Sequence, residues 1–306
     1  MIETSIQLGD PAAYRGVVIT PLFPRRTPVT PYLTLGEALP RGLRVTEIDT
    51  DGSVPELAVV NPLATDVLLY DGEELVGAKQ NRILNVTVLV NAKSAIRIPV
   101  SCVEEGRWEA RSDALSAATH TASPAVRSRK AAALEPEPLA RGVAQGEVWD
   151  AVAAEMAAHG VDSPTAAQSD VFHARARNLG DLRAAFPLVP SQSGAVLTVG
   201  TEAVCLDWVS RTEAFVWLYP KLLDGYLLDA LERLDQVPAT LEEIERFTSA
   251  LAMAAVTRRP SAGRGTDLRL RGDRCRGSGL ELDGELLQLS AFSAPDLQRP
   301  ESHRRR

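Results

Sequence analysis

Short apolar runs separated by turn residues fill the first hundred residues of this chain. The runs are rich in Val, Leu and Ile, with Pro, Gly, Asn and Asp between them, and they cover 16–22, 43–48, 56–60, 67–70 and 83–90. Short apolar runs bounded by turn residues are typical of β-strands with brief connections. The sequence therefore predicts that the N-terminal third of the chain is built mainly from strands.

Turn residues also indicate four hairpins. Asp71-Gly72 separates two apolar stretches, and an Asp-Gly pair favours the tight primed turn of a β-hairpin. A second early hairpin is expected to fold back around 91–94, and two more are expected at 195–206 and 279–289. The two early hairpins would place polar residues at their tips.

Helical patterns occupy the middle of the chain. Each predicted helix shows apolar residues at helical spacing, a start signal, or a glycine at its end. The predicted helices are 147–159 followed by Gly160, one opening at Ser163-Pro164, one over 212–234 that contains Pro220, and one opening at a capping box of Thr240 and Glu243.

The order of these elements favours an α+β fold. Strands come first, helices follow and a last hairpin precedes the tail, without alternating βαβ units. We expect mostly antiparallel sheet built from hairpins and packed by three to five helices from the middle of the chain. One domain is expected over 1–295, with a β-rich part at 1–115, a flexible excursion at 116–146, and helices plus two hairpins at 147–295; a disordered tail follows at 296–306.

A second polar stretch is also expected to be loosely structured. The segment 258–276 holds seven arginines against two aspartates and is interrupted by glycines. The arginines could bind an anion, and the glycines would let the backbone approach it closely. Alternatively, Asp267 and Asp273 could pair with arginines within the segment. A solvated loop is the plainer interpretation.

Composition argues against several classes of function. A net charge of −7 disfavours nucleic-acid and membrane partners, since both attract basic surfaces. The three cysteines are far apart, which disfavours a disulfide framework or zinc ribbon, and the four histidines lack metal-binding spacing, so no metal site is expected. The chain shows neither a signal-like start nor a long apolar segment, and we expect a cytoplasmic protein.

Functional side chains are concentrated between 71 and 108. Lys79-Gln80-Asn81-Arg82 places four hydrogen-bonding side chains in a row between two apolar runs. The two cations could hold phosphate or carboxylate, while the two amides could read the polar edge of a base or sugar. In the alternative interpretation, the amides tie down a bulge and the cations are merely exposed.

Carboxylates and a thiol accompany this run. Glu73 and Glu74 are neighbours on a strand, so at most one can enter any given pocket. Cys102 ends an apolar strand, and a nucleophilic cysteine would need a base or positive field, for which Arg107 and His120 are nearest in sequence; a buried structural thiol is the alternative. The candidate ligand-binding residues are Glu73, Glu74, Lys79, Gln80, Asn81, Arg82, Cys102, Glu104 and Trp108.

No familiar catalytic pattern accompanies these residues. The sequence contains no nucleophile elbow, no P-loop and no dinucleotide-binding fingerprint. It therefore assigns neither a reaction nor a cofactor.

Several segments resemble one prokaryotic family. They are 72–82 (GEELVGAKQNR), 98–108 (IPVSCVEEGRW), 145–149, 195–207, 217–231 and the last hairpin. The family is named for its association with ADP-ribosylglycohydrolases (ARG) and the rhodanese-phosphatase superfamily. The resemblance implies NAD- or ADP-ribose-linked metabolism and a functional link to an ADP-ribosylglycohydrolase, and it implies no catalytic residue.

Three functional hypotheses follow. In the first, the protein binds a nucleotide-like or ADP-ribose-related ligand, with Lys79 and Arg82 on phosphate and Trp108 stacked on a ring. In the second, it is a small-molecule enzyme that uses Glu73, Glu74 or Glu104 as acid or base, or Cys102 as nucleophile. In the third, it is a non-catalytic scaffold. The first two require 79–82 and 104–108 to converge on one hollow.

Overall fold

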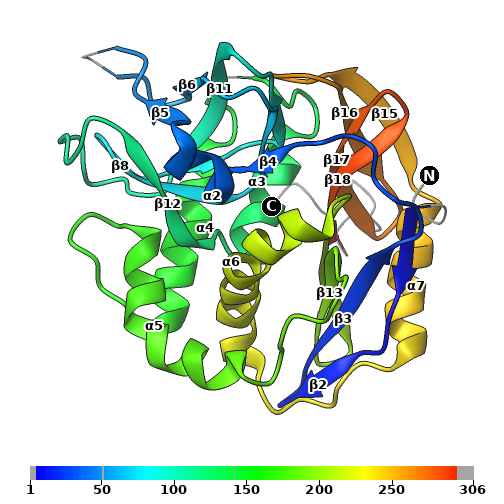
Figure 1. Cartoon of the computed structure of the whole chain (residues 1–306). Helices are drawn as coiled ribbons and strands as arrows, with labels where there is room; N and C mark the ends of the chain where they lie inside the picture. Colours follow the sequence, from blue (N-terminus) through cyan, green and yellow to red (C-terminus); the bar gives the residue numbers. More distant parts are fainter. Residues whose placement is uncertain (1–4, 50–51, 141, 295–306) are drawn as a thin grey trace.

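The computed structural model describes residues 5–49, 52–140 and 142–294. These residues form six α-helices and three sheets, and all strand pairs are antiparallel except one, which confirms the predicted α+β class. A large sheet with helices on its two faces lies beside a smaller β-rich part (Figure 1).

The large sheet contains nine strands in the order β1-β3-β13-β14-β18-β17-β16-β15, with β2 also paired to β3. The hairpins expected at 195–206 and 279–289 are confirmed as β13–β14 and β17–β18. The strands are β1 (Ile6–Leu8), β2 (Ala12–Tyr14), β3 (Val17–Pro24), β13 (Gly194–Val199), β14 (Glu202–Val209), β15 (Ala255–Pro260), β16 (Thr266–Arg271), β17 (Cys275–Leu282) and β18 (Glu285–Ser293).

Apolar side chains on both faces of this sheet are buried. Ile19 and Leu197 belong to the core shared with α3 (Pro124–Leu134), α4 (Gln145–His159), α5 (Gln168–Arg183) and α6 (Thr212–Ala230). Leu22 and Val196 point to the other face, where α7 (Leu241–Ala252) packs through Ile244, Phe247 and Leu251 (Figure 1). Because successive side chains of a strand alternate between faces, strands apolar on both sides need a cover on each side.

The smaller part comprises two sheets around a second core. Their strand orders are β12-β8-β9-β11-β6-β5 and β10-β7-β4, and α2 (Leu35–Ala38) with the short helix η1 (Leu39–Arg41) packs beside them. The strands are β4 (Leu33–Thr34), β5 (Arg44–Thr46), β6 (Glu56–Asn61), β7 (Val67–Leu69), β8 (Glu73–Gly77), β9 (Arg82–Leu84), β10 (Val88–Val90), β11 (Ser94–Cys102) and β12 (Leu115–Thr121).

Both early hairpin predictions are wrong. β7 and β8 flank Asp71-Gly72 but enter different sheets, β7 beside β10 and β4, and β8 beside β9 and β12. Likewise, β10 pairs with β7, whereas β11 pairs with β6 and β9. The reason is burial, because Asp71 lies inside the molecule, paired with Lys130, rather than at a solvated tip.

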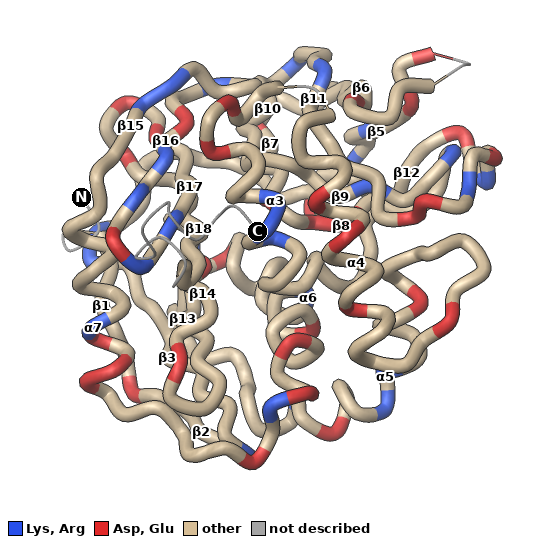
Figure 2. The backbone as a smooth tube through the Cα atoms, turned by 180° about the vertical axis from the view of Figure 1, so that it is seen from behind, with Lys and Arg blue, Asp and Glu red and all other residues tan. Residues whose placement is uncertain are grey.

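The two stretches expected to be loose contain regular secondary structure. The supposed excursion at 116–146 contains β12, α3 and the start of α4, and the segment 258–276 contributes to β15, β16 and β17. Figure 2 shows basic positions following β15 and β16, and Asp267 pairs with Arg269 inside the segment. Polar composition misled the prediction, because other charges of the segment have partners distant in sequence, as Arg264 has in Asp66 and Arg271 has in Glu135. The tail predicted at 296–306 lies outside the described residues, and the single domain over 1–295 stays a prediction.

The helix predictions hold with one exception. α4 ends at Gly160 in the left-handed conformation, α7 carries the capping box of Thr240, and α6 continues through Pro220 to the short helix η2 (Leu231–Arg233). The helix expected at Ser163 begins instead at Gln168, because the Ser163 hydroxyl accepts from the Ala167 N–H and fixes the turn before α5. No helix among the described residues is long and apolar enough to cross a membrane.

A buried polar cluster joins α3 to both β-parts. Arg127 donates two hydrogen bonds to the Asp207 carboxylate, at 2.8 and 2.6 Å, and Lys130 pairs with Asp71. Burial lowers the pKa of Lys130 to about 8 despite the nearby Asp71 carboxylate. Burial also raises the pKa of Asp207, but Arg127 outweighs it, so the net pKa is lowered. The central polar cluster comprises Tyr70, Asp71, Arg127, Lys130, Asp207, Tyr226 and Ser290.

Candidate functional site

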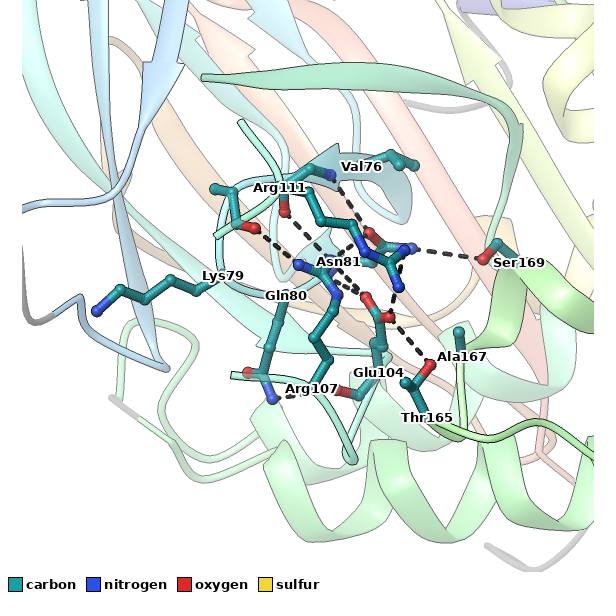
Figure 3. Close-up of polar contacts among 12 residues, drawn as sticks. Val76, Lys79, Gln80, Asn81, Glu104, Arg107, Arg111, Thr165, Ala167 and Ser169 are labelled. Carbon is teal, nitrogen blue, oxygen red and sulfur yellow. Dashed lines mark hydrogen bonds and ion pairs between the residues drawn. The ribbon is translucent and has the colours of Figure 1, made fainter. Parts of the chain in front are cut away.

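The two polar stretches singled out in the sequence lie together in the structure. Glu104 accepts hydrogen bonds from the Asn81 backbone N–H (3.1 Å), Arg107 Nη2 (2.6 Å) and Thr165 Oγ1 (3.0 Å). Figure 3 shows these groups converging on the Glu104 carboxylate, while Lys79 points away from it. The 78–81 connection between β8 and β9 is thereby tied to the loop that follows β11.

Most polar atoms at this junction are already used by the protein. Glu104 is almost fully buried; burial raises its pKa, but Arg107 and the Asn81 N–H outweigh it, so the net pKa is lowered. Gln80 Nε2 donates to the Glu104 carbonyl at 3.0 Å, and Asn81 Oδ1 accepts from Arg107 Nη2 at 3.2 Å. Glu104, Gln80 and Asn81 therefore serve as an internal framework.

Glu73 and Glu74 point to different partners, as neighbours on a strand should. Glu73 pairs with Lys221 of α6 at 2.8 Å. Glu74 Oε2 lies 2.8 Å from His120 Nε2, and its Oε1 accepts from Asn81 Nδ2 at 3.2 Å. The His120 ring stacks on Phe172, with ring centroids 3.7 Å apart. Only Glu74 joins the junction of the two polar stretches.

A further carboxyl group, that of Glu155 in α4, is buried near the pair of Glu74 and His120. It accepts hydrogen bonds from the Ser123 hydroxyl and from Gln168 Nε2, the latter at 3.0 Å. Burial raises the pKa of Glu155 to about 7, against the opposing influence of those hydrogen bonds. The carboxyl therefore changes charge near neutral pH inside the fold.

Glu155 should lower the stability of the protein as the pH rises. An unfolded glutamate ionises near 4.5 and the folded one near 7, so the folded state binds more protons between these values. The stability that this raised pKa gives the folded state is fully present below pH 4.5 and is lost as the pH rises through about 7. The total loss is about 3 kcal/mol. Urea unfolding from about pH 5 to about pH 8 covers most of this range and should show Glu155→Gln gaining on the wild type by about 2.5 kcal/mol. The exposed Glu147→Gln on the same helix is the control, and an equal slope in all three proteins would contradict the expectation.

Cys102 is a buried thiol. Burial raises its pKa, although the Glu104 N–H, 3.3 Å from the sulfur, and the Arg82 charge favour the thiolate. Its backbone exchanges two hydrogen bonds with the Gln145 side chain, which anchors the start of α4 to β11. These observations agree with the structural interpretation of Cys102.

Arg82 differs from Arg107, which pairs with Glu104, because no carboxylate of the described residues forms an ion pair with it. The side chain is fully buried; Nη1 donates to Gln80 Oε1 at 2.9 Å, while Nε and Nη2 have no hydrogen-bond partner among the described residues. Burial lowers its pKa, partly offset by Cys102 and Glu47. Arg82 Cζ lies 5.6 Å and Lys79 Nζ 5.2 Å from the ring centroid of Trp108, which is 47% exposed. We call Lys79, Arg82 and Trp108 the Arg82 site.

Sequence reasoning placed some of these residues and missed others. Arg107 and His120 were considered only as helpers of Cys102, whereas they hold Glu104 and Glu74. Thr165 and Glu47 were missed, because each reaches the junction from a distant part of the chain without a local pattern. Among the described residues, no group of three or more His, Cys, Asp or Glu side chains could hold a metal ion.

The comparisons with known proteins give one result. The family model described as the ARG and Rhodanese-Phosphatase-superfamily-associated Protein domain matches residues 5–292. Neither the curated proteins nor the solved structures give a significant match. Because the family model spans nearly the whole chain, the protein belongs to the ARG and rhodanese-phosphatase-superfamily-associated family, as the resemblance indicated.

Proposed function

We propose that this protein binds a small anionic ligand, nucleotide-like or related to ADP-ribose, at the Arg82 site. The observation that carries the proposal is the fully buried Arg82 guanidinium, two of whose nitrogens have no partner in the part of the chain that the structure describes, beside the half-exposed Trp108. A buried cation without a matching anion is costly, and buried donors without partners are rare in native structures. Two adjacent guanidinium nitrogens fit a phosphate or carboxylate in bidentate fashion.

Trp108 supports the same function in two ways. Its ring lies against both Lys79 and Arg82, so its exposed side is free to contact a planar ligand group. Because Arg82 is fully buried and Trp108 is half-exposed, the proposed path of a ligand to the guanidinium runs along the Trp108 side chain. In this arrangement Gln80 and Asn81 orient the site instead of reading the ligand, because their side chains already contact Glu104, Arg82 and Arg107.

The family name supports the metabolic setting. ARG, read as ADP-ribosylglycohydrolase, suggests NAD- or ADP-ribose-linked metabolism and a functional link to such an enzyme. The three cysteines are all free and buried, which suits the reducing cytoplasm. The acidic balance of the chain suits a small ligand better than a nucleic acid.

The catalytic alternative finds less support in the same geometry. Glu104 is held by Arg107, Glu73 by Lys221 and Glu74 by His120. Cys102 is a buried thiol with a raised pKa. Each candidate acid, base or nucleophile is therefore already engaged or buried within the protein. For this reason we propose binding rather than catalysis.

Arg82→Met should weaken ligand binding at least tenfold. The substitution keeps an unbranched side chain but removes the charge-assisted hydrogen bonds, each of which contributes about 1.5–3 kcal/mol. Calorimetry and thermal-shift assays with ADP-ribose, NAD and AMP measure the effect, since a ligand at a hundred times its Kd stabilises by about 2.7 kcal/mol. The exposed Arg177→Met on α5 removes the same charge elsewhere and should bind as the wild type does.

Trp108→Ala tests the site from its exposed side. Loss of the ring should weaken binding while leaving the fold intact, and Trp217→Ala, similarly half-exposed on α6, should not weaken it. If none of these ligands stabilises the wild type, or if Arg82→Met and Arg177→Met bind equally well, the proposed function is wrong.

A further inference from the structure

Two unpartnered buried groups of opposite character border the Trp108 side chain. Arg82 offers the donors Nε and Nη2, and Glu47 offers the acceptor Oε2. The other Glu47 oxygen, Oε1, accepts from the Lys79 backbone N–H at 3.2 Å. The glutamate is therefore anchored through one oxygen, and its second oxygen forms no hydrogen bond with the described residues.

The surroundings of Gly52 place the Glu47 oxygen close to Trp108. A Cβ atom added to Gly52 would lie 3.3 Å from Glu47 Oε2 and 3.4 Å from Trp108 Cζ2. Arg82 Cζ approaches the same indole ring to 5.6 Å. Glu47 is close enough to influence the charge of Arg82, yet the unused atoms of the two residues do not bond to each other.

We infer that Glu47 is a specificity residue of the Arg82 site, where its free oxygen accepts a hydrogen bond from a hydroxyl of the ligand whose anionic group binds Arg82. This inference rests on the proposed function and narrows its ligand class. The ligand is a sugar phosphate or nucleotide that carries a hydroxyl within reach of the Arg82-bound anion.

The Glu47 carboxylate disfavours ligands that lack a hydroxyl and favours those that carry one. A plain anion at Arg82 is repelled by Glu47 and leaves its oxygen unpaired, which disfavours binding. A hydroxylated anion instead donates a charge-assisted hydrogen bond that offsets the repulsion. Sites built to bond a ligand hydroxyl reject analogues that lack it, because the buried partner is then left unsatisfied.

Two monophosphates of similar charge test this arrangement. The wild type should bind ribose 5-phosphate at least about tenfold more tightly than propyl phosphate, which has no hydroxyl. In Glu47→Gln this ratio should fall about fivefold, because the neutral amide forms a hydrogen bond weaker by about 1 kcal/mol, while loss of the repulsion helps both phosphates alike and leaves their ratio unchanged. Glu105→Gln makes the same charge change on a nearby exposed side chain and should keep the wild-type ratio.

The outcomes separate this inference from the proposed function. If both phosphates bind in an Arg82-dependent way and Glu47→Gln keeps the wild-type ratio, Glu47 has no role in specificity and only the inference fails. If neither phosphate binds to the wild type or to Glu47→Gln, both proposals fail. Urea unfolding of each variant verifies that its fold is intact.

Discussion

Replacing Asp207 by asparagine should cost the protein about 3–5 kcal/mol of unfolding free energy. Asp207 is fully buried and accepts from Arg127 Nη1 and Nη2, from the Tyr70 hydroxyl at 2.6 Å and from the Tyr226 hydroxyl at 2.8 Å. Asparagine keeps the shape but removes the charge, so that Arg127 becomes a buried cation without a counter-charge. The loss is a large share of the roughly 5–15 kcal/mol that stabilises a typical domain.

An exposed ion pair elsewhere in the chain provides the control. Asp235 pairs with Arg15 at 2.6 Å, but the side chains are 62% and 44% exposed. Asp235→Asn should cost less than about 1 kcal/mol. The backbone of Asp235 has a φ of +64°, which asparagine tolerates well, so the comparison isolates the effect of burial. Urea unfolding measures both variants, and a cost for Asp207→Asn similar to that of Asp235→Asn would contradict the expectation.

Removal of both charges should restore much of the lost stability. An Arg127→Met/Asp207→Leu double variant leaves neither partner of this pair as an unpaired buried charge, and apolar replacement of a buried pair is often close to neutral. Tyr70 and Tyr226 then lose an acceptor, so recovery should be partial. If the double variant is instead less stable by the sum of the two single losses, the two residues act independently.

Local patterns predicted the elements whose interactions are short-range in sequence. The Thr240 capping box, the glycine after α4 and the hairpin β17–β18 each depend on residues within a few positions of one another. For the same reason, two apolar runs on either side of a turn were enough to predict the pairing of β13 with β14. These elements form wherever their own residues favour them.

The errors have a common physical cause. Asp71-Gly72 is typical of an exposed hairpin turn, but Asp71 finds its partner in Lys130 of α3, 59 positions away. The polar run around Arg127 is typical of a mobile loop, but its charge is matched by Asp207, 80 positions away. Burial of a charge is decided by whether a partner arrives from elsewhere in the fold, and composition within a window does not contain that partner.

The candidate site shows the same division. The runs 79–82 and 104–108 were expected to converge, and Asn81 and Glu104 do hydrogen-bond. The sequence could not predict which polar atoms already have hydrogen-bond partners inside the protein. The Glu104 carboxylate oxygens, for example, accept hydrogen bonds from Arg107 and Thr165. Only when these partners are known does Arg82 stand out as a buried cation with unpartnered nitrogens among the described residues. Glu47 lies in a different part of the chain, just after β5, and contacts the Lys79 backbone.

Gly72→Ala should also destabilise the protein strongly, by about 3 kcal/mol or more. Gly72 has a φ of +83°, which alone costs an alanine about 1–2 kcal/mol. Its Cβ would lie 2.6 Å from Arg127 Cδ and 2.7 Å from Arg127 Nε. Neither side can yield easily, because Gly72 N–H donates to Leu84 O, Gly72 O accepts from Ala122 N–H, and Arg127 is held by Asp207. The added methyl must therefore displace the buried guanidinium from its counter-charge.

Gly284→Ala separates the backbone cost from this packing effect. Gly284 has a φ of +84°, nearly the same as that of Gly72, but no atom of the described residues lies within 4 Å of its added Cβ. Gly284→Ala should therefore show only the backbone cost, and the excess in Gly72→Ala measures the displacement of Arg127. Combining Gly72→Ala with Asp207→Asn should cost less than the sum of the single losses, because both act through the same ion pair. Equal losses for the two glycine variants in urea unfolding would show that Arg127 yields freely, and that the packing around the central polar cluster is looser than its hydrogen bonds indicate.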